Sequence, residues 1–87
     1  MRQLTVDLEH GLHVVPCSEI SKLARSFEGQ VRLIREEYVA DAKSMLDLLQ
    51  LNAPKGTVLV LEVEGDGADL LADQFDQLFR DRFETSR

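Results

Sequence analysis

Two stretches of the chain alternate between residues that suit a buried face and residues that suit an outer face, as in half-buried strands. The first spans residues 3–8 and the other spans residues 58–64. The positions predicted to be buried are Leu4, Val6 and Leu8 in the first stretch and Leu59, Leu61 and Val63 in the other. Two apolar runs between them, Val31–Arg35 and Tyr38–Ala40, predict a second and a third strand.

Two longer stretches change to the i, i+3, i+4, i+7 spacing of an amphipathic helix. The first starts at Pro16, and its apolar positions are Ile20, Leu23, Ala24 and Phe27. We expect this helix to end at Gly29, because glycine often adopts the left-handed conformation that follows a helix. The last helix runs from Ala68 to Arg82, and its apolar positions are Ala68, Leu71, Ala72, Phe75, Leu78 and Phe79.

A short helix is predicted from about Lys43 to Leu51, with Asp41 or Ala42 near its N-cap. Asn52 and Pro54 mark its end, since neither residue type continues a helix well. The resulting order is β-α-β-β-α-β-α. The simplest packing is an open-faced α/β sandwich of the α+β class, in which three helices cover one face of a four-stranded, mostly antiparallel sheet. With no repeat or linker, we expect one domain over residues 1–87.

The short middle helix carries more apolar side chains than one face of three turns can bury. We therefore expect Met45, Leu46 and Leu49 to form an exposed patch, which is typical of a protein–protein contact site. The alternative is a helix that is buried on two sides.

Composition narrows the classes of function. The chain has 87 residues, a formal net charge of −6 and one cysteine. The sequence contains no dense Lys/Arg cluster, which argues against nucleic-acid binding. It contains no apolar run of about 20 residues, which argues against a membrane-spanning helix. A single cysteine, which cannot form an internal disulfide, is typical of a cytoplasmic protein. His10 and His13 lack metal-ligand partners at suitable spacing, so we expect no metal site. Basic residues are denser in the first half, which predicts a dipolar surface with one basic end.

The string Gly11-Leu12-His13-Val14-Val15-Pro16 holds the main candidate for chemistry. Pro16 suits the first turn of a helix, which would make Val15 the N-cap, and valine cannot cap. The first backbone N–H groups would then be unpaired beside His13, and such a turn attracts anions. A neutral imidazole nitrogen is nucleophilic and can carry a phosphoryl group. His10 lies outside the motif, and we expect it to be solvent-exposed and inert.

This string, followed by Asp41-Ala42-Lys43-Ser44-Met45, resembles the HPr family, the histidine-containing phosphocarriers of the sugar phosphotransferase system. The resemblance covers about Leu4 to Phe79. It implies a carrier without a cofactor, rather than an enzyme, that takes a phosphoryl group on His13 from enzyme I and passes it to a sugar-specific A component. It also implies a monomer.

The resemblance assigns further residues around this chemistry. Val15, Pro16 and Cys17 would surround the phosphate at the helix N-terminus, although Cys17 itself suits a packing role better than that of a reactive thiol. Ser44 matches a regulatory serine that an HPr kinase/phosphorylase modifies in some bacteria. The implied partner-binding residues are Lys22, Arg25, Met45, Leu46 and Leu49. Asp47 stands where many members have glycine.

The chain departs from the family at Val15, where HPr proteins carry an arginine that pairs with the phosphoryl group. Losing that contact is expected to slow transfer by one to two orders of magnitude, on the order of 1.5–3 kcal/mol. Helix N–H groups, or Lys22 and Arg25 one or two turns along, are the expected compensations. Two alternatives stay open beside the carrier. One is a regulatory binding protein controlled at Ser44 with His13 vestigial, and the other is a structural interaction module.

Overall fold

The four predicted strands form one sheet in the computed structural model, which describes residues 1–84. The strands are β1 (Arg2–Thr5), β2 (Gln30–Arg35), β3 (Tyr38–Asp41) and β4 (Val58–Glu64). Their order across the sheet is β1-β4-β2-β3, and each neighbouring pair is antiparallel. The two strands at the centre, β4 and β2, come from opposite halves of the chain, so their pairing joins the two halves.

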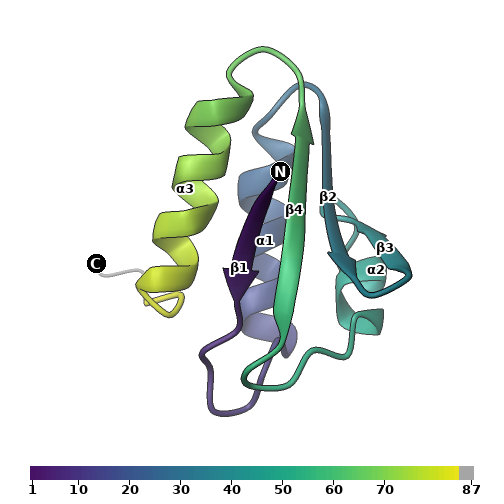
Figure 1. Cartoon of the computed structure of the whole chain (residues 1–87), viewed down its shortest axis with the longest axis vertical. Coiled ribbons are helices and arrows are strands. Elements are labelled where there is room, and N and C mark those ends of the chain that lie inside the picture. Colours follow the sequence, from purple (N-terminus) through teal and green to yellow (C-terminus); the bar gives the residue numbers. More distant parts are fainter. Residues whose placement is uncertain (85–87) are drawn as a thin grey trace.

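Three helices lie on one side of this sheet, as Figure 1 shows. They are α1 (Val14–Arg25), α2 (Met45–Gln50) and α3 (Ala68–Arg80). The α3 helix packs against β1 and β4, while α2 packs against β3 and against α1. This arrangement confirms the predicted open-faced sandwich. None of the helices within residues 1–84 has the length and apolar character that crossing a membrane requires.

The core lies between the sheet and the helices, where the alternating strand positions meet the apolar helix stripes. Leu59 and Leu61 of β4 are almost completely buried, as are Ile20 of α1 and Phe75 of α3. These positions are the ones that the periodicity predicts. Burying each such side chain contributes on the order of 1.5–3 kcal/mol, so the two faces hold each other in place.

Two predicted element ends are wrong near the first strand and first helix. The strand β1 ends at Thr5 rather than Leu8, because the segment opposite it turns at Gly56, whose φ is 93°. The α1 helix ends at Arg25, well before Gly29. Its last carbonyls accept i→i+3 bonds, including one from the Ser26 N–H to Leu23 O at 3.2 Å, so no left-handed glycine is needed.

The last helix also ends early, at Arg80 instead of Arg82. Arg82 and Phe83 both adopt positive φ angles, 56° and 61°, which turn the chain back on the helix. The Phe83 ring then packs on Phe79 with 4.8 Å between ring centroids, and Phe83 joins the core. Non-glycine residues seldom take this conformation, so the sequence pattern did not predict the turn.

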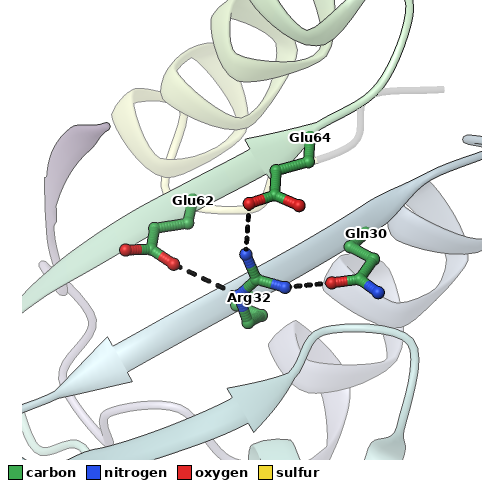
Figure 2. Close-up of polar contacts among 4 residues, drawn as sticks. All are labelled: Gln30, Arg32, Glu62 and Glu64. Carbon is green, nitrogen blue, oxygen red and sulfur yellow. Dashed lines mark hydrogen bonds and ion pairs between the residues drawn. The ribbon is translucent and has the colours of Figure 1, made fainter.

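The face of the sheet that no helix covers carries an ionic cluster centred on Arg32 of β2 (Figure 2). Its Nε donates to Glu62 at 3.1 Å and its Nη2 donates to Glu64 at 3.0 Å, both on β4, and Gln30 accepts a further bond. These carboxylates hold the pKa of Arg32 above its ordinary value. Because its charge is matched by these acids, Arg32 does not contribute to a free basic end of the molecule.

Candidate functional site

His13 lies where the loop after β1 enters α1. It is the N-cap of the helix, with an extended backbone, and its side chain is exposed. Val14, Val15 and Pro16 are therefore the first three helical residues, and the prediction that Val15 is the N-cap is wrong. The prediction placed Pro16 at the first helical position, whereas Pro16 is the third. Proline is tolerated throughout the first turn, because the N–H groups of that turn have no partner within the helix.

The first turn of α1 leaves backbone donors next to His13. No side chain within the described residues 1–84 caps the turn, and the Cys17 N–H already donates to the His13 carbonyl at 3.1 Å. Pro16 has no N–H to offer. Val15 is thus the one residue of the predicted set Val15, Pro16 and Cys17 whose N–H is available to a phosphate. Val14, which was not in that set, offers a second N–H. The positive end of the helix dipole adds to these two donors.

Gly11 allows the loop before His13 to lie against the segment that follows α2. Its φ is 68°, and a Cβ at this position would lie 2.4 Å from the Ala53 carbonyl oxygen. The neighbouring Leu12 N–H donates to the same oxygen at 2.9 Å. Any larger residue would push these segments apart. Gly11 therefore lets the loop that carries His13 lie directly against residues 53–54. The loop after β1 and the loop after α2 meet below the sheet in Figure 1.

An open pocket of about 550 Å³ forms where the two loops meet. Its polar side chains are His10, His13, Arg35 and Asn52. The His10 and His13 rings stand edge to face with 6.3 Å between their centroids. His10 is exposed as predicted, but it belongs to the same pocket as His13. The sequence pattern missed Arg35, because only the fold brings the end of β2 to these loops.

The comparisons with known proteins agree with this geometry. The sequence profile of one family, described as "PTS HPr component phosphorylation site", matches residues 1–81. The chain belongs to the HPr family. The phosphocarrier protein HPr of Vibrio cholerae is 33% identical over 67 residues, which are 77% of this chain and 79% of that protein. The phosphocarrier protein NPr of Shewanella violacea is 30% identical over 83 residues, 95% of this chain and 91% of that protein.

Solved structures of HPr proteins share the fold. The crystal structure of HPr-C-His from Thermoanaerobacter tengcongensis superposes with a TM-score of 0.89 at 22% identity, and the alignment covers 100% of both chains. The resemblance read from the two short motifs is thus confirmed, and the chain is a member of a family of phosphotransferase-system phosphocarriers.

The α2 helix of this HPr-family chain starts one residue after Ser44, which is its N-cap. The Ser44 hydroxyl accepts a bond from the Asp47 N–H at 3.2 Å. The N-cap therefore lies two residues beyond Ala42, and the helix starts at Met45 rather than at the predicted Lys43. The Asp47 carboxylate in turn accepts from the Asp41 N–H at 3.1 Å. Ser44 thus holds the start of the helix, which places a modifiable hydroxyl beside the apolar side chains of α2.

The α2 helix exposes part of its apolar surface, although less than predicted. Leu46 is 66% exposed and Leu49 is 38% exposed, whereas Met45 is half-buried against the core. Leu48 is fully buried and anchors the helix. The helix is therefore buried on one side only. The exposed patch consists of Leu46 and Leu49, with Met45 at its edge.

Lys22 and Arg25 are exposed, as predicted, in the last turn of α1. At 1.5 Å per residue, nine residues of helix separate Lys22 from His13 by about 13 Å along the axis. Arg25 is farther away, and its Nε donates to the Lys43 carbonyl at 3.1 Å, just before α2. Neither residue compensates for Val15 at His13. Both lie at the other end of α1.

Cys17 is completely buried in the core, which confirms its packing role. Its Sγ lies 3.6 Å from the Leu12 carbonyl oxygen. Burial raises the pKa of the Cys17 thiol to about 11, so the reactive thiolate is scarce at neutral pH. Through this contact Cys17 supports the loop that carries His13, and its side chain does not line the pocket that His13 faces.

Proposed function

We propose that this chain accepts one phosphoryl group on His13 from enzyme I and passes it to a sugar-specific A component. The observation that carries the proposal is the position of His13, an exposed N-cap whose helix offers N–H groups at Val14 and Val15 that have no partner among residues 1–84. Such a turn binds an anion without help from side chains. Membership of the HPr family supports the same role. The chain acts as a stoichiometric carrier and not as an enzyme.

The transfer step moves a phosphoryl group between two nitrogen or oxygen nucleophiles. A neutral ring nitrogen of His13 attacks phosphorus with its lone pair, and the bond from phosphorus to the donor breaks as the new N–P bond forms. We assign Nδ1, the nitrogen nearer the backbone, as the acceptor. The N–H groups of Val14 and Val15 then donate to phosphoryl oxygens, where negative charge gathers.

The docking surface for enzyme I and the A component consists of Leu46, Leu49 and the basic pair Lys22 and Arg25. Apolar side chains at the centre with cations at the rim are typical of such protein contacts. The cations also attract acidic partners before contact. Met45 at the edge of the patch contributes its exposed part. We expect the chain to work as a monomer in the cytoplasm.

Ser44 supports a second candidate function, control by phosphorylation through a kinase of the HPr kinase/phosphorylase type. Its hydroxyl bonds to the Asp47 N–H and is not needed for the core. A phosphate there adds about −1.5 to −2 charges at a helix N-terminus, where the helix tolerates them. The same charge lies beside Leu46 and Leu49, so it would weaken partner binding without unfolding the domain.

The carrier proposal is tested with purified enzyme I, phosphoenolpyruvate and intact-mass measurement. We expect the wild-type chain to gain one phosphoryl group that mild acid removes, since a phosphoramidate bond is acid-labile. His13→Ala should remove the modification, and the matched variant His10→Ala should keep it. If the wild type stays unmodified by an enzyme I that phosphorylates an ordinary HPr, the proposal fails. An acid-stable modification lost in Ser44→Ala would support the regulatory function instead.

A further inference from the structure

Among residues 1–84, Arg35 is the one lysine or arginine whose side chain lines the pocket with His13. It ends β2 and is partly buried. Its Nη1 donates to the Leu51 carbonyl at 2.9 Å and to the Asn52 carbonyl at 2.6 Å. These bonds fix the guanidinium against the loop that follows α2. The anchored group is held in place before any ligand arrives, so little side-chain freedom is lost on binding.

The anchoring uses only one of the three guanidinium nitrogens. Nε and Nη2 of Arg35 form no hydrogen bond with any residue in the 1–84 range, and no carboxylate there pairs with the group. A guanidinium has five N–H donors and does not lose its charge, so Arg35 keeps three donors and a full positive charge for the pocket. This distinguishes Arg35 from Arg32 and Arg2, whose charges are matched by acids.

The pocket needs such a group once His13 carries a phosphoryl dianion. Two backbone N–H groups serve the three phosphoryl oxygens, and the side chain of Val15 adds no donor. We infer that Arg35 is a catalytic residue of the transfer, whose Nε and Nη2 donate to the phosphoryl group on His13 as it arrives. The inference rests on the proposed function, because it assigns a further contact to the same reaction.

The inference is tested by comparing Arg35→Gln with Lys55→Gln. Lys55 is an exposed cation in the loop that follows α2, the loop against which Arg35 is anchored, but it does not line this pocket. Lys55→Gln therefore controls for the loss of one positive charge. Each variant receives phosphoryl groups from enzyme I and, separately, from phosphoramidate, which needs no docking. In that step the His13 N–P bond forms while the P–N bond of phosphoramidate breaks and ammonia leaves. We expect Arg35→Gln to react about tenfold more slowly with both donors, and Lys55→Gln to match the wild type.

A purely structural role for Arg35 is separated by adding Val15→Arg to Arg35→Gln. Val15 is 60% exposed in the first turn of α1, so an arginine there can reach the phosphoryl group but cannot rebuild the bonds to Leu51 and Asn52. We expect the double variant to recover most of the lost rate. A double variant as slow as Arg35→Gln would show that Arg35 only supports the loop, and would overturn the inference.

The unmutated protein provides a reading that does not depend on a variant folding. Phosphorylation of His13 should shift the ¹⁵N–¹H resonance of Arg35 Nε and slow its exchange with water. An unchanged resonance, or an Arg35→Gln variant that reacts as fast as Lys55→Gln, overturns the inference while the carrier function stands. A wild type that takes no phosphoryl group on His13 from enzyme I refutes the proposed function itself.

Discussion

The exposed patch on α2 permits a sharp comparison between Leu46 and its neighbour Leu48. Leu46 is 66% exposed, so only about a third of its burial energy is at stake, on the order of 0.5–1 kcal/mol. Leu48 is completely buried, and Leu48→Ala should cost about 2–5 kcal/mol. In a domain of this size 1 kcal/mol changes Tm by about 4–8 °C. Leu46→Glu should therefore lower Tm by a few degrees, and Leu48→Ala by about 10 °C or more.

The same Leu46→Glu variant should impair partner binding. A carboxylate in the middle of an apolar contact is expected to raise the KM for phosphorylation by enzyme I about tenfold or more, with little change in kcat. Leu70→Glu is the matched control, because Leu70 is also 66% exposed and its helix, α3, lies on the opposite side of the molecule from α2 (Figure 1). Thermal unfolding by circular dichroism and initial rates over a range of carrier concentrations provide both measurements. An equal KM for the two variants would refute the docking surface, and a Tm loss in Leu46→Glu as large as in Leu48→Ala would refute its exposure.

Two further predictions concern single side chains. Ser44→Ala removes the N-cap of α2 and should lower the free energy of unfolding by about 1 kcal/mol. Ser44→Asp keeps a hydrogen-bond acceptor and should melt close to the wild type. Equal melting temperatures of the two variants would contradict the capping role. For Cys17, burial raises the pKa from 9.0 to about 11, so between those pH values the unfolded chain releases a proton that the folded chain keeps. The free energy of unfolding, which this group leaves unchanged at neutral pH, should therefore fall by about 2 kcal/mol on going to pH 11. In urea titrations, the free energy of unfolding of Cys17→Ala should fall less toward pH 11 than that of the wild type, by this amount. An identical decrease in that variant would contradict the raised pKa of Cys17.

The sequence predicted the elements and the core because burial imposes a period that is visible in the residues themselves. Leu59 and Leu61 alternate on β4, and Ile20 follows the helical spacing on α1. The ends of elements were predicted less well because they depend on distant contacts. The chain turns back through a left-handed conformation at Phe83, which brings its ring to Phe79. The local sequence contains no glycine or other turn signal that predicts this conformation.

The candidate site shows the same division. His13 and Ser44 were identified because each lies in a short motif, and the fold places both at helix starts. The N-cap assignment of Val15 failed because Pro16 fits several positions of a first turn. Arg35 was not identified as part of the site, because its place in the pocket depends on carbonyls at Leu51 and Asn52 that only the folded chain brings to the end of β2.

The most direct test of the account is to locate the phosphoryl group on the intact wild-type chain. The protein is incubated with enzyme I and phosphoenolpyruvate, digested at alkaline pH to preserve N–P bonds, and sequenced by tandem mass spectrometry with low-energy fragmentation. The account predicts a single phosphoryl group on His13. A group on His10 or on Ser44, or an unmodified chain under conditions in which an ordinary HPr is fully phosphorylated, would contradict it.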